Sequence, residues 1–335
     1  MALRNAGPGA ENVGRRQGAS GVERKFVPRE IGIICLSAPP CPKGPARLQA
    51  GSMIAVPTTY SDDLELLRSS AVAAGIIASG FFRREVKTWN KENASPVTEA
   101  DILVDRYLAS SLLAARPDYG WLSEETADNP SRLDCERVFV VDPIDGTRGF
   151  LRGEDSWSVS IAVVENGVPV AGVVYAPIRD ELYDAVKGEG ARLNGKALVR
   201  HRRAGAPPLI PAPGAVHQEM QAAGLHYTRG PAYPSLAYRL VQVATGKLDA
   251  AVARRGSQDW DIAAAALILD EAGIAFSDVC SGFPRFNRRD VRHGALAALS
   301  DMSLKPLVHA ALIKVYGCPA DDEIAADQAS PDERI

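Results

Sequence analysis

The stretch VFVVDPIDGT, residues 138–147, decides both the fold and the chemistry that this sequence predicts. Val138–Val141 is an apolar run of four, which predicts a buried strand that ends at Asp142. Pro143 fixes one φ angle and lacks a backbone donor, so the chain must turn there. Ligands of α/β proteins bind beyond the carboxyl ends of the strands. We therefore expect the turn to hold Asp142 and Asp145 at a binding edge, with the Ile144 carbonyl facing the same point.

Two carboxylates and a carbonyl that crowd together repel one another unless a cation lies between them. Gly146 lets the backbone approach a ligand closely, and its N–H group, with that of Thr147, can bind a phosphate oxygen. An Asp-x-x-Asp pair alone is more often a simple capped turn. Asp-Pro-Ile-Asp-Gly-Thr after a buried strand is far more restrictive, and it predicts a site for a cation and a phosphate.

Three more acidic segments stand apart from the surface charge. Glu124 and Glu125 follow an apolar run, Asp261 begins an alanine-rich helix, and Asp101 lies in SPVTEAD, residues 95–101. Asp261 and the Glu pair have plain alternatives, since a first-turn Asp caps its helix and a Glu pair in a loop is usually solvated. No two of the five histidines share helical i, i+4 spacing. Oxygen ligands, and hence Mg²⁺ rather than zinc, are expected.

The rest of the chain mixes helical and strand periodicity, which predicts a layered α/β or α+β protein with mixed sheets. Asn166-Gly167 between two alternating runs predicts a tight hairpin. A Pro-rich loop is expected over 205–214. Helices are expected over 61–81, 97–115, 235–245, 258–272 and 304–316, and strands over 138–141, 157–164, 168–175, 181–186, 248–252 and 293–300.

Composition excludes several classes of protein. A formal net charge of −3 gives no electrostatic case for binding a nucleic-acid polymer, and no apolar stretch is long enough for a membrane span. The five cysteines are odd in number and widely spaced, which argues against a disulfide framework and favours a cytoplasmic protein.

The two ends differ from the middle in composition. Residues 1–56 are rich in Gly, Pro and Arg, and are expected to be a disordered tail or an over-long start with Met53 as the real initiator. Residues 318–335 carry six acids against one Arg and are expected to be a solvated, disordered tail.

These segments together resemble the inositol monophosphatase superfamily of Mg²⁺-dependent, lithium-sensitive phosphomonoesterases. VVDPIDGTRGFLR at 140–152 fits the first family signature, and WDIAAAALILDEAG at 260–273 fits the second, although Ile274 stands where Gly or Ala is usual. SPVTEAD resembles a third element, with Ala94 in place of Gly. The resemblance implies an α-β-α-β-α sandwich, shared with fructose-1,6-bisphosphatase, over residues 57–317. It implies an N-lobe of about 57–190 and a C-lobe of about 191–317.

The resemblance also implies the roles of the site residues, with two to three Mg²⁺ ions. One ion is expected on Glu124, Asp142 and the Ile144 carbonyl, and a second on Asp142, Asp145 and Asp261. A third, looser ion would join Glu124 and, through water, Asp101. Asp101 and Thr147 would orient and deprotonate the attacking water, with Glu124 in the catalytic set. The phosphate would bind the amides of Gly146 and Thr147, and the substrate would also meet Asp145 and Asp261.

The substrate is expected to be a small phosphate ester. Members that prefer inositol carry a Glu seven residues before the second-signature Asp, and that place is Arg254 here. An arginine cannot accept hydrogen bonds from inositol, but it suits a second phosphate. A surface arginine pair, Arg254 and Arg255, is the plain alternative.

Other segments resemble the bacterial 3′(2′),5′-bisphosphate nucleotidases, so adenosine 3′,5′-bisphosphate is the first expectation. Inositol, sugar or histidinol phosphates on the same scaffold come second, and an inactive sensor of phosphate and metal is a third possibility. A monomer or a homodimer is expected.

Overall fold

The computed structural model describes residues 58–91, 95–200 and 205–318. The expectations for residues 1–56 and 319–335 therefore lie outside the described residues.

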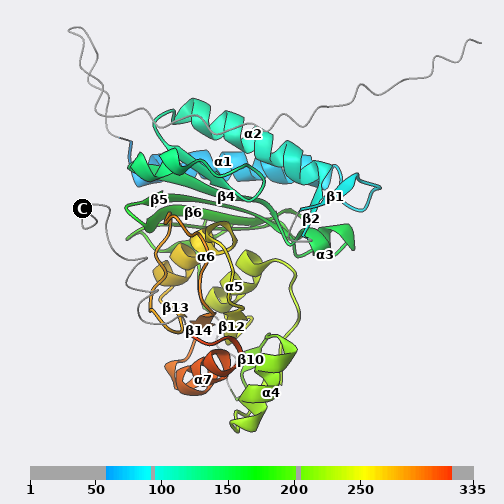
Figure 1. Cartoon of the computed structure of the whole chain (residues 1–335), viewed down its shortest axis with the longest axis vertical. Coiled ribbons are helices and arrows are strands. Elements are labelled where there is room, and N and C mark those ends of the chain that lie inside the picture. The colour runs from blue at the N-terminus through cyan, green and yellow to red at the C-terminus, as the bar shows by residue number, and fades with distance from the viewer. Residues whose placement is uncertain (1–57, 92–94, 201–204, 319–335) are drawn as a thin grey trace, which may run out of the picture. The chain divides into compact units, whose positions relative to one another are not determined.

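A seven-stranded mixed sheet forms the larger of the two main sheets (Figure 1). β3 and β4 are parallel and the other neighbours are antiparallel. Asn166 and Gly167 both have positive φ, as the predicted hairpin between β5 and β6 requires. In sheet order the strands are β3 (Gly120–Ser123), β4 (Arg137–Asp145), β5 (Ser158–Glu165), β6 (Val168–Ala176), β7 (Glu181–Val186), β8 (Ala191–Leu193) and β9 (Lys196–Ala197).

Helices cover both faces of this sheet. α1 (Tyr60–Ser79) and α2 (Glu99–Ala115) lie on one face, and α5 (Leu236–Thr245) and α6 (Asp259–Glu271) lie on the other (Figure 1). Successive side chains of β4 point to opposite faces of the sheet. Phe139 and Val141 pack toward α1 and α2, and Val138 and Val140 pack toward α5 and α6.

The alanine-rich run of α6 has a packing reason. A Cβ on Gly172 of β6 would lie only 3.1 Å from the Ala264 Cα, so helix and sheet approach closely where both side chains are small. Small residues here bring the start of α6, and with it Asp261, close to the sheet.

A second, three-stranded sheet lies beyond α5 and α6, in the order β12 (Ala250–Ala253), β14 (Leu296–Leu299) and β13 (Ala275–Asp278). Its other face packs against α4 (Gly214–Ala222) and α7 (Lys305–Tyr316) (Figure 1). The layers are therefore helix, sheet, helix, sheet, helix, and the predicted fold class is confirmed. Two short pairs complete the list, β1 (Thr88–Asn90) with β2 (Pro96–Thr98) and β10 (Leu209–Ile210) with β11 (Thr228–Arg229).

The local predictions miss some elements. β3, β13 and α4 were not anticipated, and β10 interrupts the segment expected to be a loop. Two smaller elements are helices as well, α3 (Thr147–Leu151) and the 3₁₀ segment Pro130–Asp134, with further 3₁₀ turns at Pro177–Arg179 and Met302–Leu304. No helix in the described ranges is both long enough and apolar enough to span a membrane.

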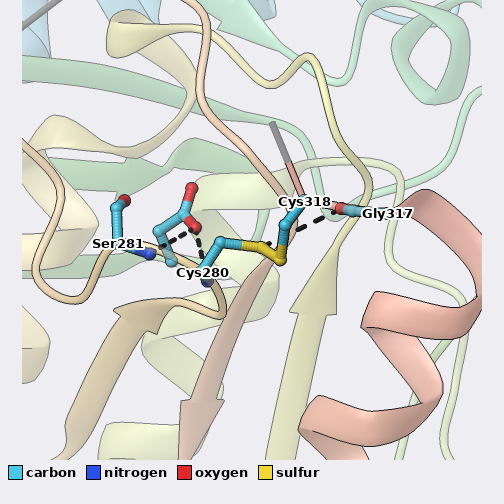
Figure 2. The surroundings of a disulfide bond; sticks show 5 residues. Cys280, Ser281, Gly317 and Cys318 are labelled. Carbon is cyan, nitrogen blue, oxygen red and sulfur yellow. Dashed lines mark hydrogen bonds between the residues drawn. A yellow bond between two sulfur atoms is a disulfide. The ribbon is translucent and has the colours of Figure 1, made fainter. Parts of the chain in front are cut away.

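The cysteine prediction is wrong for one pair. Cys280 and Cys318 form a disulfide across 38 residues of sequence (Figure 2). Cys280 follows β13, where Asp278 accepts hydrogen bonds from the backbone N–H groups of Cys280 and Ser281. Cys318 lies two residues past the end of α7, so wide spacing in sequence concealed two segments that the fold brings together.

In air-equilibrated buffer without a reducing agent, Cys280→Ser should lower the free energy of unfolding by up to ~4 kcal/mol, because closing a loop of this size restricts the unfolded chain by about that amount. Denaturant titration with and without dithiothreitol measures it. The difference between the variant and the wild type should vanish when the thiols are reduced. An unchanged midpoint in the absence of reductant would show that this bond does not form in solution.

Candidate metal and phosphate site

β4 runs past Asp142 to Asp145, so the predicted strand end is an irregularity inside a longer strand. Asp142 is paired with Ser160 and Asp145 with Ser158, and the register shifts between them. Such an irregularity re-aims side chains beside a site. Asp142 Oδ1 accepts a hydrogen bond from the Ile144 N–H group at 3.0 Å, which holds the turn.

Three of the predicted acids come together at this edge. Glu124, Asp142 and Asp261 each offer a carboxylate oxygen, and these oxygens lie within 4.8 Å of one another. Glu124 directly follows β3, where its N–H group donates to the Val141 carbonyl at 3.2 Å. Asp261 lies in the first turn of α6 and its Oδ2 accepts from the Gln258 N–H group at 2.7 Å. Segments far apart in sequence thus form one acidic group.

Asp145 lies outside this three-oxygen group and faces the N-terminus of α5. Its Oδ2 accepts from the Ser235 hydroxyl at 2.5 Å and from the Ala237 N–H group at 2.7 Å, and its Oδ1 accepts from the Leu236 N–H group at 3.1 Å. Ser235 also caps α5 by accepting from the Tyr238 N–H group. The Pro234-Ser235-Leu236 segment therefore anchors an acid of the site.

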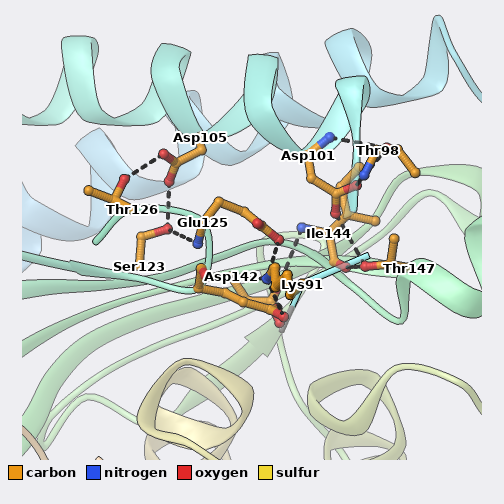
Figure 3. A network of polar contacts seen from close by, with 11 residues as sticks. Lys91, Thr98, Asp101, Asp105, Ser123, Glu125, Thr126, Asp142, Ile144 and Thr147 are labelled. Carbon is orange, nitrogen blue, oxygen red and sulfur yellow. Dashed lines mark hydrogen bonds and ion pairs between the residues drawn. The ribbon is translucent and has the colours of Figure 1, made fainter. Parts of the chain in front are cut away.

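Asp101 and Thr147, predicted to act together, lie side by side (Figure 3). The Thr147 hydroxyl is 3.2 Å from Asp101 Oδ1 and 3.1 Å from the Ile144 carbonyl oxygen. The other oxygen of Asp101 accepts from the Thr98 hydroxyl and N–H group, at 2.5 and 2.8 Å, and so caps α2. The capping role and the predicted chemical role are compatible, because each uses a different carboxylate oxygen.

Gly146 needs its glycine for space and conformation. Its φ is 92°, and a Cβ would lie 2.8 Å from the Ser235 N atom. Thr147 begins α3, and the first N–H groups of a helix have no partner within it. The two predicted phosphate-binding amides thus lie beside the acidic group.

A basic residue that the sequence analysis missed contacts this group. Lys91 Nζ is 2.9 Å from a carboxylate oxygen of Glu124. It is also 2.9 Å from one of Glu125 (Figure 3). Burial alone would lower the pKa of Lys91, but the two glutamates outweigh burial and raise it. A single lysine in a polar segment carries no sequence signal for such a contact.

Arg254 directly follows β12 and is exposed. Its positive charge is near enough to act against the strong rise in the pKa of Asp261. The Ser257 hydroxyl donates to the Arg254 carbonyl at 3.1 Å, which closes the loop between β12 and α6. The arginine thus lies at the rim of the site, on the side of the smaller sheet.

Burial and mutual repulsion raise the pKa values of these acids. Burial, followed by the charges of neighbouring acids, raises the pKa of Asp142 and that of Asp261 well above the usual range. Burial raises the pKa of Asp101 to about 6 and that of Asp145 to about 6, although hydrogen bonds to Thr98 and to the start of α5 oppose the rise. Burial raises the pKa of Glu125 to about 8 against the attraction of Lys91. So much unfavourable charge indicates a place for added cations.

Comparison with known proteins agrees with the fold. The sequence profile of the inositol monophosphatase family matches residues 62–315. The chain belongs to this family. A solved structure of the extragenic suppressor protein SuhB from Bartonella henselae superposes with a TM-score of 0.66 at 29% identity, covering 75% of this chain and 98% of that one.

Curated relatives carry several names. The Nus factor SuhB of Pasteurella multocida is 31% identical over 76% of this chain and 96% of its own length. An inositol-1-monophosphatase of Mesorhizobium japonicum is 35% identical over 56% of this chain and 73% of its own. The 3′(2′),5′-bisphosphate nucleotidase CysQ of Aggregatibacter actinomycetemcomitans is 30% identical over 63% and 82%. The nucleotidase type is thus one of several similar types.

Asp142→Asn should stabilise the metal-free protein at pH 8 relative to wild type and have little such effect near pH 4. Because the folded-state pKa of Asp142 is raised, the unfolded chain loses this proton first, and wild-type stability falls as the pH rises through the folded-state pKa. Urea titrations in EDTA at both pH values measure the difference. An advantage of the variant that grows toward low pH would contradict the assignment.

Proposed function

We propose that this protein is a Mg²⁺-dependent phosphomonoesterase that hydrolyses a small phosphate ester with water. The observation that carries the proposal is the convergence of Glu124, Asp142 and Asp261, whose oxygens lie within 4.8 Å of one another. Membership of a phosphatase family supports the same reaction class.

The donor set fits Mg²⁺. Carboxylate oxygens are hard ligands, and Mg²⁺ is usually held by a few of them together with water and substrate phosphate. The raised pKa values of Asp142 and Asp261 indicate carboxylates that lack sufficient positive charge nearby. We assign Glu124, Asp142, the Ile144 carbonyl and Asp261 to the metal, with Asp145 beside them; a total of two to three ions remains a prediction. Bound Mg²⁺ would supply charge neutralisation and a more acidic water.

The chain's own groups perform the proton handling. Asp101 Oδ1 contacts the Thr147 hydroxyl, whereas the cap of α2 uses only the other carboxylate oxygen of Asp101. A pKa of about 6 lets Asp101 accept a proton at neutral pH while remaining a stronger base than an ordinary Asp. These two residues would orient the attacking water and take its proton.

We assign binding of the substrate phosphate to the backbone N–H groups of Gly146 and Thr147. Two N–H groups at the start of α3 suit an anion. Asp145 turns its oxygens toward Ser235 and the first amides of α5, which reduces its repulsion of an incoming phosphate. Phosphoryl transfer needs chiefly such positioning and charge stabilisation.

For the substrate we propose a bisphosphate, with adenosine 3′,5′-bisphosphate the first candidate. Arg254 supplies an exposed positive charge near Asp261, where a second phosphate could pair with it. The similarity to a nucleotidase supports this choice. The similarity to an inositol-1-monophosphatase, and to a histidinol-phosphatase of Chlorobaculum parvum that is 33% identical over 63% of this chain and 83% of its own, keeps a monophosphate as the second candidate.

Asp142→Asn should abolish Mg²⁺-dependent hydrolysis, with a loss of at least about 100-fold in kcat, while the fold persists. Phosphate release from adenosine 3′,5′-bisphosphate, inositol 1-phosphate, fructose 1,6-bisphosphate and histidinol phosphate measures it. Asp184→Asn is a matched control, because Asp184 is a buried carboxylate in the same sheet that pairs with Arg68 instead. Retained activity in Asp142→Asn would refute its role, and wild-type protein inactive on every ester with Mg²⁺ would favour the sensor.

Arg254→Glu should reduce kcat/KM for a bisphosphate by about 10-fold or more, and for a monophosphate much less, because it replaces attraction of the second phosphate by repulsion. Arg255→Glu makes the same charge change at the next position and serves as the control. Steady-state kinetics on the two substrates measure both variants. Equal losses on both substrates would remove Arg254 from the specificity argument.

A further inference from the structure

Asp105 is a buried carboxylate on α2, one helical turn after Asp101, and it has no part in the chemistry assigned above. Only 6% of the residue is exposed. Its Oδ1 accepts from the Ser123 hydroxyl at 2.5 Å and its Oδ2 from the Thr126 hydroxyl at 2.6 Å (Figure 3). Both carboxylate oxygens are therefore engaged by hydroxyl groups of one short segment.

That segment, Ser123–Thr126, carries the glutamate pair. Ser123 is the last residue of β3 and Thr126 follows Glu125, so Asp105 grips the chain on both sides of the two glutamates. The Ser123 hydroxyl also accepts from the Glu125 N–H group at 3.3 Å, which extends the same network to the backbone between the two contacts.

Burying a carboxylate at this place costs free energy, which indicates that it holds other groups in position. Removing it from water is unfavourable, and burial raises the pKa of Asp105 even though its hydroxyl partners and the charges of Lys91 and Arg106 oppose the rise. Hydroxyl hydrogen bonds to a charged acceptor are short and strong, and they define direction as packing alone does not. The two bonds lock the segment against α2, the same helix that presents Asp101 to Thr147.

We propose that Asp105 is a positioning residue that holds Glu124 in place for the metal by clamping Ser123 and Thr126. The proposal rests on the metal-dependent function proposed above. Helix α2 then sets two parts of the site at once, with Asp101 directed toward the attacking water and Asp105 directed toward the segment that carries a metal ligand. Residues that orient ligands in this way typically change metal affinity 10- to 100-fold when they are removed.

Mn²⁺ binding to the purified full chain, followed by electron paramagnetic resonance of the free ion, tests the proposal. Asp105→Ala should weaken binding about 10- to 100-fold, and Asp105→Asn, which keeps part of the hydrogen bonding, should weaken it less. A dissociation constant within twofold of wild type in a folded Asp105→Ala variant would overturn the proposal.

Control variants separate positioning from general loss of stability. Asp184→Ala removes another buried carboxylate, bound to Arg68, and should lower stability without changing Mn²⁺ affinity. Thr126→Val and Ser123→Ala each remove one clamp contact and carry the test even if Asp105→Ala does not fold. Thr126→Val alone should weaken Mn²⁺ binding. Added to Asp105→Asn, it should weaken binding by less, because part of the contact that it removes is already lost. If the losses of the two single variants simply added in the double variant, the clamp would be contradicted.

Hydrogen–deuterium exchange of the metal-free protein gives a second readout that does not depend on metal. The backbone amides of Glu124 and Glu125 are hydrogen-bonded in the structure, and they should exchange at least about 10-fold faster in Thr126→Val or Asp105→Asn than in Asp184→Ala. Unchanged exchange would refute the clamp. If wild-type protein binds no Mn²⁺ while the two clamp variants still show the faster exchange, the proposed function is refuted and the clamp stands.

Discussion

Repulsion among carboxylates that are held together away from water is the constraint on which the rest of the site depends. Burial and the negative charges of neighbouring acids favour the protonated forms of Asp142 and Asp261. The rest of the fold must therefore supply the free energy that holds the two carboxylates in place. It does so through elements that are rigid for other reasons. One of the two longest strands of the central sheet carries Asp142, and a closely packed alanine-rich helix carries Asp261.

Helix N-termini provide the main compensation within the described residues. Asp101 and Asp261 lie in the first turns of α2 and α6, and Asp145 receives the first N–H groups of α5. The positive end of each helix dipole favours these negative charges. The same arrangement explains why capping and chemistry coincide: an acid that closes its helix with one oxygen is already fixed, and the other oxygen is free to face the site.

Sequence reasoning succeeded where the signal is local. Asn166-Gly167 predicts its hairpin because few residues tolerate positive φ, and the run from Val138 to Thr147 combines a buried strand with an obligatory turn. It failed where the role of a residue depends on a contact with a segment that is distant in sequence. Lys91 acts through a contact more than thirty residues along the chain, and Cys280 meets Cys318 only because β13 and α7 end together. Asp105 was within reach, since it lies at i+4 from Asp101 on the same helix face.

In the proposed function, the acids that hold the metal and the residue that selects the substrate lie on different parts of the fold. The acids lie on the central sheet and on helices packed against it, where a change of side chain disturbs the core. Arg254 instead follows a strand of the smaller sheet, is exposed, and reaches the acids only through its charge. Substitution there can alter which ester is preferred without moving Asp142 or Asp261. In the proposed function, the reaction class therefore depends on the buried acids, whereas the choice of substrate depends on an exposed position at the rim of the site.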